Sequence, residues 1–183
     1  MSRMADPPTL KRAAFLDRDG VINHDVGYIH KPADFAWIDG ARAAIRRLND
    51  LGALVFVVTN QAGIARGMYG EADVVALHQW VNMELAADGA RVDSFYFCPH
   101  HPTAGNGPYS VTCTCRKPAP GMLMRAAAEW PVDLGASFLI GDRDTDLAAA
   151  EAAGVRGFQF AGGNLHDFLD GVLGTVSWSK PIA

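Results

Sequence analysis

The chain has 183 residues, 49% of them hydrophobic, and its acidic and basic residues nearly balance to a formal net charge of −4. This length and composition are typical of one globular domain with a sizeable core, and they argue against widespread disorder. The charge gives no basic surface, so we expect no nucleic-acid partner. Without a polybasic patch or a long apolar run, we also expect no membrane association.

The first residues are polar and contain prolines, and they lack the apolar core of a signal peptide. We therefore expect a cytoplasmic protein, with a flexible tail over residues 1–11 and a single domain over residues 12–183. The chain has three cysteines. An odd number of cysteines, in a compartment that keeps thiols reduced, does not favour a disulfide framework.

Apolar stretches alternate along the chain with stretches of helical spacing. The segment 53–60, ALVFVVTN, is continuously apolar and rich in β-branched residues, as in a strand that is buried on both faces. The segment 40–52 places Ile45 and Leu48 on one helical face and ends at Gly52. In chain order we predict strands over 12–17, 53–60, 92–98, 136–142 and 155–160, alternating with helices over 40–52, 71–89, 121–130 and 144–154.

This alternation predicts an α/β fold with a doubly wound, Rossmann-like parallel sheet and helices on both of its faces. In such open sheets, ligands bind beyond the carboxyl ends of the strands. Polar residues occupy these positions here. They are Asp17 and Asp19 after the first strand, Thr59 and Asn60 after the second, Asp142 and Asp146 after the fourth, and Arg116 and Lys117 before the third helix.

The set of strand-end residues suits phosphoryl transfer. Clustered carboxylates repel one another unless a cation lies among them, and Mg²⁺ prefers oxygen ligands and bridges to a substrate phosphate. One carboxylate can attack phosphorus while a second transfers protons, and a lysine can stabilise the phosphoryl charge. A single Asp after a strand is more often a turn or helix-capping residue. The combination at successive strand ends is what favours catalysis.

Every cysteine lies in one loop, 98–115, which also holds two adjacent histidines. Cys98, Cys113 and Cys115 together with a histidine would complete a tetrahedral structural zinc site. A disulfide and a reactive thiol are the alternatives, but no basic partner activates just one cysteine. Cys98 alone could be an ordinary buried residue. That reading leaves the other two unexplained, in a polar loop that cannot order itself by burying surface.

Four segments resemble, in this order, the four motifs of the haloacid dehalogenase (HAD) superfamily of phosphatases. They are FLDRDGV, VVTNQAGIARG, CRKPAPGM and IGDRDTD. The segments GYIHKPADFAWIDG and CPHHP, ahead of CTCRKPAPGM, are similar to the D-glycero-D-manno-heptose 1,7-bisphosphate phosphatases, whose nearest relatives are the histidinol-phosphate phosphatases. The resemblance covers about residues 14–154.

The resemblance implies a role for each matching position. Asp17 would be the nucleophile and a Mg²⁺ ligand, and Asp19 the general acid/base, with its backbone carbonyl on the metal. Lys117 would pair with Asp17 and with the phosphoryl group. The other roles are Thr59 and Asn60 on the phosphoryl group, Asp142 as a Mg²⁺ ligand, Asp146 behind the ligands, Arg116 near the sugar or its second phosphate, and Cys98, His100, Cys113 and Cys115 on Zn²⁺. His101 is the alternative to His100, which the family spacing favours.

The resemblance further implies a Mg²⁺-dependent phosphatase that acts through an aspartyl-phosphate, most specifically on the C7 phosphate of a heptose bisphosphate. Histidinol phosphate is the alternative substrate. The alternative class is a non-catalytic zinc module that binds a partner, and the aspartate and lysine set argues against it. We expect a monomer without a large cap domain, because the connection 23–39 is too short for one. Loops should then bind the substrate, namely 27–31, 61–67 with Gln61 and Arg66, and the zinc loop with Arg116.

Two features depart from the family pattern. Arg143 follows Asp142 where Lys is common, and Arg and Lys present their donors differently. The stretch AGGNLHDFL, at 161–169, lacks the threonine-glycine turn of the heptose enzymes. Both departures bear on substrate preference more than on reaction type. The other histidines, His24, His30, His78 and His166, are expected at the surface or in loops.

Overall fold

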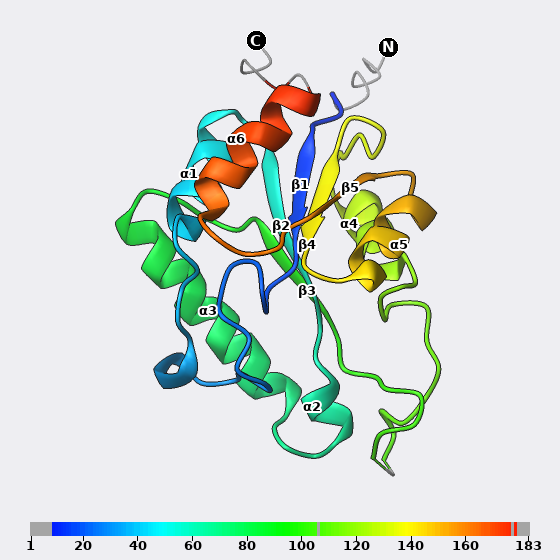
Figure 1. Cartoon of the computed structure of the whole chain (residues 1–183). Helices are drawn as coiled ribbons and strands as arrows, with labels where there is room; N and C mark the ends of the chain where they lie inside the picture. The colour runs from blue at the N-terminus through cyan, green and yellow to red at the C-terminus, as the bar shows by residue number, and fades with distance from the viewer. Residues whose placement is uncertain (1–8, 106, 177, 179–183) are drawn as a thin grey trace, which may run out of the picture.

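A computed structural model of the protein describes residues 9–105, 107–176 and 178. Its centre is a five-stranded parallel sheet with the strand order β3-β2-β1-β4-β5 (Figure 1). The strands are β1 (Ala13–Leu16), β2 (Leu54–Asn60), β3 (Ser94–Cys98), β4 (Phe138–Gly141) and β5 (Arg156–Gln159). The parallel doubly wound sheet expected from the sequence is therefore confirmed.

Helices cover both faces of the sheet. One face packs against α1 (Ala41–Asp50), α3 (Glu71–Ala87) and α6 (Leu165–Val176), and the other packs against α4 (Gly121–Glu129) and α5 (Asp144–Ala152). Figure 1 shows α1 and α6 lying together on one side of the strands and α4 and α5 on the other. Two short elements, the 3-10 helix η1 (Pro32–Asp34) and α2 (Ala62–Ala65), lie in the loops beyond the strands.

Strand β2 shows why the apolar run 53–60 becomes a central strand. Val55 and Val57 point into the core beneath α1, α3 and α6, whereas Phe56 and Val58 point into the core beneath α4 and α5. Successive side chains of a strand point to opposite faces, so a strand covered on both faces needs apolar residues at every position. The rim begins where this pattern ends, at Thr59 and Asn60.

Two parts of the chain extend the ordered fold beyond the predicted elements. Helix α6 was not predicted, and it packs its apolar face, with Leu165, Leu169 and Val172, into the core on the α1 side. Lys11, which the sequence placed in the flexible tail, forms a bridge with Val132 and belongs to the fold. Residues 1–8 of that tail lie outside the described residues.

The connections at the carboxyl ends of the strands are loops rather than a domain. Between β1 and α1 lies η1, and between β3 and α4 no helix or strand occurs in the described residues. The absence of a large cap domain is thus confirmed for the described parts of the chain. Within 9–105, 107–176 and 178, no helix has both the length and the apolar character needed to cross a bilayer.

Candidate active site

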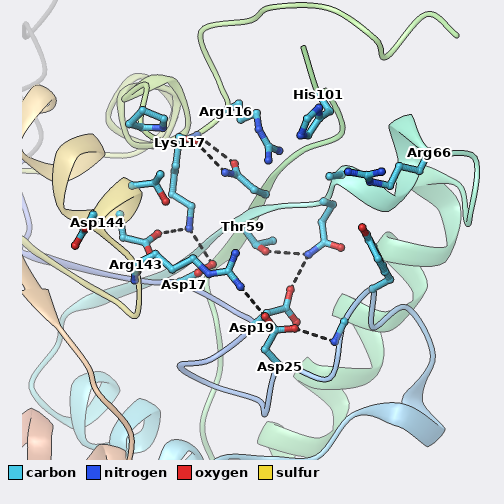
Figure 2. A pocket seen from close by; sticks show the side chains of 18 of the residues that line it. Asp17, Asp19, Asp25, Thr59, Arg66, His101, Arg116, Lys117, Arg143 and Asp144 are labelled. Atoms are coloured by element: carbon cyan, nitrogen blue, oxygen red, sulfur yellow. Dashed lines mark hydrogen bonds and ion pairs between the residues drawn. The ribbon is translucent and has the colours of Figure 1, made fainter. Parts of the chain in front are cut away.

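A cavity of about 680 Å³ opens at the carboxyl ends of the strands. Figure 2 shows Asp17, Asp19 and Asp25 on one side of it, Arg116, His101 and Arg66 on the other, and Thr59 between them. The cavity thus joins the ends of β1 and β2 to the loops that follow them. The remaining lining residues include Gly27, Tyr28, Asn60, Gln61, Tyr69, Lys117, Arg143, Asp144, Thr145 and Asp146.

Asp17 lies at the floor of the cavity beside a buried lysine. Its backbone N–H still donates to the carbonyl of Ile140, so the residue continues the ladder between β1 and β4. Its Oδ1 lies 2.9 Å from Lys117 Nζ, which also pairs with Asp146 and donates to the Val58 carbonyl at 2.8 Å. A buried ammonium between two carboxylates is rigidly placed, because each partner needs the others to offset its desolvation.

The two members of this pair titrate in ways that keep the lysine charged. Burial raises the pKa of the Asp17 carboxyl to about 7, against the opposing effect of the Lys117 ammonium and with a further contribution from Asp146. Burial alone would lower the pKa of Lys117, but the carboxylates of Asp17 and Asp146 outweigh it and leave that pKa raised. Near neutral pH the site therefore holds a permanent cation beside a carboxyl that readily changes its protonation state.

Three carboxylates at this floor fit a divalent cation. Oxygen atoms of Asp17, Asp142 and Asp146 all lie within 4.8 Å of one another. Oδ1 of Asp142 is buried and makes no hydrogen bond, which leaves an acceptor that a cation would satisfy. Gly20 makes the arrangement possible, since its φ is +91° and a Cβ there would lie 2.3 Å from Asp142 Oδ2. The donor set is all oxygen, as Mg²⁺ prefers.

Asp146, which the resemblance placed behind the metal ligands, lies in the carboxylate cluster itself. Its carboxylate contacts Lys117, belongs to the carboxylate cluster, and accepts from the backbone N–H of Arg143 at 3.1 Å, which caps α5. Gly141 lets it approach, because a Cβ at that position would lie 2.2 Å from Asp146 Cβ. The Asp19 side chain, in contrast, is not part of the carboxylate cluster.

The carboxylate of Asp19 is held by donors from several directions. Arg18 Nη2 lies 3.1 Å from Oδ1 and 3.0 Å from Oδ2. Asn23 Nδ2 donates to Oδ1 at 3.0 Å, and Gln61 Nε2 donates to Oδ2 at 3.0 Å. About a fifth of the side chain stays exposed, so Asp19 is fixed but open to the cavity. A carboxylate held in this way can transfer protons only within a narrow range of positions.

Two amides that the sequence assigned to substrate serve the protein itself. Asn60 Nδ2 donates to the Lys117 carbonyl at 3.0 Å, and its Oδ1 accepts from the Lys117 N–H at 3.1 Å. Gln61 Nε2 donates to Thr59 Oγ1 at 2.9 Å as well as to Asp19, and its Oε1 accepts from Tyr69. Asn60 therefore positions Lys117, and Gln61 positions Thr59 and Asp19. Direct contact of either amide with substrate stays a prediction.

The cationic side of the cavity is built from two loops. Arg116 Nη1 donates to the His100 carbonyl at 3.1 Å, which ties Arg116 to the cysteine loop. The guanidinium carbon of Arg66 lies 6.0 Å from the centre of the Tyr28 ring. His101 accepts backbone N–H donors from Thr103 and Ala104 at its Nδ1, so its Nε2 is the nitrogen that carries a proton.

The four predicted zinc ligands converge. Cys98, His100, Cys113 and Cys115 each offer a ligand atom within 4.8 Å of the others. His100 Nδ1 lies 3.3 Å from Cys115 Sγ, and the sulfurs of Cys98 and Cys115 are 3.2 Å apart. These sulfurs are unbonded thiols, and three thiolates with one imidazole match a closed structural zinc site. His101 instead lines the cavity at the carboxyl ends of the strands.

One expectation about histidine is wrong. His78 lies on the buried face of α3, where 4% of it is exposed, and its ring stacks on Phe95 with 4.4 Å between centroids. Burial, with a further contribution from the Arg18 charge, lowers the pKa of His78 to about 3, so the ring is neutral. Val74, Leu77 and Val81, at helical spacing from His78, are all apolar, and this pattern is the sequence signal that could have placed His78 on the core side.

Sequence reasoning also missed residues that complete the cavity. Tyr69 donates its hydroxyl to Gln61 Oε1 at 2.7 Å, and burial raises the pKa of this phenol to about 12, which keeps it a donor. Asp25 pairs with Arg143 at 2.7 Å across the mouth. This pair gives Arg143 a place at the rim of the cavity. Neither Tyr69 nor Asp25 lies in a motif, so no signal in the sequence pointed to these two residues.

Comparison with known proteins agrees with this geometry. A family model described as "HAD-hyrolase-like" matches residues 114–167. The D-glycero-beta-D-manno-heptose-1,7-bisphosphate 7-phosphatase of Rhodopseudomonas palustris is 50% identical over 161 residues, which cover 88% of this chain and 89% of that protein. The chain belongs to the D-glycero-D-manno-heptose-1,7-bisphosphate 7-phosphatase family. The resemblance predicted from the four motifs and the cysteine loop is thereby confirmed.

A second curated relative and a crystal structure from this heptose bisphosphate phosphatase family are also similar to the chain. The D-glycero-alpha-D-manno-heptose-1,7-bisphosphate 7-phosphatase of Burkholderia mallei is 48% identical over 144 residues, covering 79% of this chain and 76% of that protein. The crystal structure of D,D-heptose 1.7-bisphosphate phosphatase from B. bronchiseptica, complexed with magnesium and phosphate, matches with a TM-score of 0.74 and 36% identity, covering 87% of this chain and 86% of that one. Family members are thus named for both anomers, and one has been seen with magnesium.

Proposed function

We propose that this protein is a Mg²⁺-dependent phosphatase that removes the C7 phosphate of D-glycero-D-manno-heptose 1,7-bisphosphate. The observation that carries the proposal is the buried Asp17–Lys117 pair, 2.9 Å apart, at the floor of an open cavity beside the oriented carboxylate of Asp19. Family membership supports the substrate class. The cavity's cationic side, with Arg66 and Arg116, suits a second phosphate on a small sugar.

The reaction has two displacements at phosphorus. Asp17 attacks the phosphoryl group, the bond to the sugar oxygen breaks, and that oxygen takes a proton from the Asp19 carboxyl. Asp19 then removes a proton from water, the water oxygen attacks phosphorus, and the bond to Asp17 breaks to release phosphate. Throughout both steps the cationic Lys117 and the Thr59 hydroxyl stabilise charge on the phosphoryl oxygens.

Two metals fit the side chains of this chain. Asp17, Asp142 and Asp146 would hold Mg²⁺, together with the Asp19 carbonyl that the family pattern implies. Bound there, Mg²⁺ would offset the charge of the clustered carboxylates and of the phosphate. Cys98, His100, Cys113 and Cys115 would hold a structural Zn²⁺. We further propose a monomer in the cytoplasm, where thiols stay reduced and available to zinc.

Mg²⁺ affinity should depend on pH through Asp17. Because burial raises the pKa of Asp17 to about 7, a proton competes with the metal below that pH. The dissociation constant for Mg²⁺ should rise about tenfold for each pH unit below that pKa and level off above it. Titration calorimetry at several pH values measures this directly. A dissociation constant that is flat across the same range would contradict Asp17 as a ligand.

Replacing Asp19 by Asn should reduce turnover by about 10²–10⁴-fold on a sugar phosphate, the usual contribution of general acid–base catalysis. The loss should be smaller on an aryl phosphate, because its leaving oxygen needs less protonation. Steady-state kinetics on both substrates, with wild type as reference, provide the measurement. Equal losses on leaving groups of very different basicity would remove Asp19 from the proton-transfer role.

The proposed substrate is tested by a phosphate-release screen. Purified protein with Mg²⁺ is assayed against both anomers of the heptose 1,7-bisphosphate, the heptose 1-phosphate and histidinol phosphate. We expect the highest kcat/KM for one heptose bisphosphate anomer and none for the 1-phosphate, whose C7 carries no phosphate to remove. A higher kcat/KM for histidinol phosphate would replace the proposed substrate, and absence of Mg²⁺-dependent release from any of them would refute the enzyme.

A further inference from the structure

Arg18 lies in the sequence between the two proposed catalytic aspartates, Asp17 and Asp19, yet it is fully buried and does not line the cavity. It is the largest fully buried side chain of the described residues, with 0% exposed. A guanidinium is seldom buried so completely unless its donors are all engaged. Arg18 does not line the cavity, and the mechanism above assigns it no role.

Each end of the Arg18 fork has a partner. Nε donates to Asp19 Oδ1 at 3.2 Å, and Nη2 reaches both Asp19 oxygens at 3.1 and 3.0 Å. Nη2 also donates to the Ile29 carbonyl at 2.7 Å, in the loop whose Gly27 and Tyr28 line the cavity. Nη1 lies 3.4 Å from His78 Nε2. The planar fork therefore joins Asp19, the 27–31 loop and helix α3.

His78 completes this set as an acceptor. A protonated imidazole would place two cations in contact in the core, and the pKa lowered to about 3 by burial, and further by Arg18, keeps the ring neutral. Neutral His78 can then accept a hydrogen bond from Arg18 Nη1 at its Nε2 only if its own proton is on Nδ1. Stacking on Phe95 fixes the plane of the ring, so the acceptor points at one place.

We propose that Arg18, held in place by the acceptor His78, is a positioning residue for Asp19: its guanidinium fork fixes the carboxyl that transfers the proton and ties that carboxyl to the Ile29 carbonyl of the 27–31 loop. Arg18 touches neither substrate nor metal in this assignment. Its effect on turnover passes through Asp19. Because Arg18 also contacts the Ile29 carbonyl, the position of the Asp19 carboxyl depends on the position of the 27–31 loop.

This inference rests on the proposed phosphatase reaction, and a double-mutant cycle tests it separately. Arg18→Lys keeps a charge but cannot span three partners, so it should lower kcat about tenfold on a sugar phosphate and less on an aryl phosphate, as loss of proton transfer would. In the Asp19→Asn background the same change should lower kcat less than about twofold, because its target is gone. An equal tenfold loss in both backgrounds would overturn the inference.

A matched pair at His78 removes the support without touching Arg18. His78→Gln retains an acceptor and should keep kcat within about twofold of wild type, whereas His78→Phe keeps the ring stack and loses the acceptor. His78→Phe should lower kcat about fivefold on a sugar phosphate and less on an aryl phosphate, the same leaving-group dependence as Asp19→Asn. Val81→Ala, on the same buried face of α3, is the control for destabilisation alone. It should lower the melting temperature and leave the leaving-group profile unchanged.

Two readouts keep the outcome clear. Wild-type turnover of the sugar and aryl phosphates is measured first, and its absence would refute the proposed function rather than the positioning role. A crystal structure of Arg18→Lys tests the positioning role without turnover. We expect the Asp19 carboxylate to leave its wild-type position or to occupy more than one. A carboxylate unmoved in that variant, or identical kinetics for the Gln and Phe variants, would overturn the inference.

Discussion

Replacing Asp17 by Asn should reduce turnover by at least about 10⁴-fold, because an amide oxygen is a poor nucleophile and loss of a nucleophile is among the largest effects of a single substitution. The change also removes one charge from the carboxylate cluster that would hold Mg²⁺. Loss should therefore appear in kcat on every substrate, whatever the leaving group. This pattern distinguishes Asp17 from Asp19, whose replacement should depend on the leaving group.

The fold should survive the Asp17→Asn change. Burial raises the pKa of Asp17 to about 7 from 3.8, so the folded state holds a proton there that the unfolded state releases. In the metal-free protein this group makes stability fall as pH rises from about 4 to 7, and Asn removes that effect. Asn also removes one of the two carboxylates that pair with Lys117, which opposes this gain, whereas Asp146 still pairs with the lysine. Above pH 7 the variant should therefore unfold cooperatively within about 5 °C of wild type in thermal unfolding without Mg²⁺.

Asp144 offers a matched control for the aspartate substitution. It lines the same cavity and carries the same charge, but its side chain lies at the exposed start of α5. Asp144→Asn should change kcat by less than about threefold, since a single exposed charge contributes little. If Asp17→Asn retained a tenth of wild-type turnover, or if Asp144→Asn lost as much, Asp17 would not be the nucleophile.

The sheet was predictable because burial on both faces leaves a direct mark on the sequence. Segment 53–60 alternates its apolar residues between two cores, so no polar residue interrupts it until Thr59. Helix α6 left a comparable mark, with Leu165, Leu169 and Val172 at intervals of four and three, but two glycines before it and two within it obscured the pattern. Hydrophobic periodicity thus identifies elements whose apolar pattern is uninterrupted, and misses a helix such as α6 whose pattern contains glycines.

The site was predictable only in part: contacts dictated by the sheet topology could be predicted, and contacts that depend on side-chain packing could not. Residues that follow strands, such as Asp17 and Asp142, meet because parallel strands present their carboxyl ends at one edge. The partners of side chains in the interior follow from packing between distant elements instead. The contact of Arg18 with His78 spans sixty positions, and that of Asn60 with Lys117 spans fifty-seven. No local pattern encodes such contacts, so the supporting roles of Asn60 and Gln61 and the contact of His78 with Arg18 required the structure.

The cysteine loop connects this division to function. Arg116 and Lys117 directly follow Cys115, and Arg116 donates to the carbonyl of His100 in the same loop. The loop therefore delivers two cationic side chains, one to the rim and one to the floor of the cavity. Its polar residues bury too little surface to fix the loop without help. The order of the cavity should then depend on what holds Cys98, His100, Cys113 and Cys115 together.

Replacing Cys113 by Ser should remove zinc and impair both stability and turnover. Each purified wild-type chain should carry about one zinc, as expected for a closed four-ligand site. Serine is a poor zinc ligand, and loss of a metal clip that orders a loop should cost about 2 kcal/mol or more, which lowers the melting temperature by about 4–8 °C in a domain of this size. Turnover should fall at least about tenfold, and added Mg²⁺ should not restore it, because the defect is the placement of Arg116 and Lys117.

Thr114→Ser is the control within the same loop. Thr114 lies between two of the proposed zinc ligands, Cys113 and Cys115, with its side chain exposed, so this variant should keep its zinc, its melting temperature and its kcat. Elemental analysis, thermal unfolding and kinetics are compared for the two variants and wild type. The kcat of Cys113→Ser should be lower than that of wild type. Wild-type protein stripped of zinc by a chelator should lose kcat to the same extent and regain it when Zn²⁺ is added. Zinc-free wild type with full activity, or a disulfide between two of these cysteines in freshly reduced protein, would contradict a structural zinc that positions the lysine.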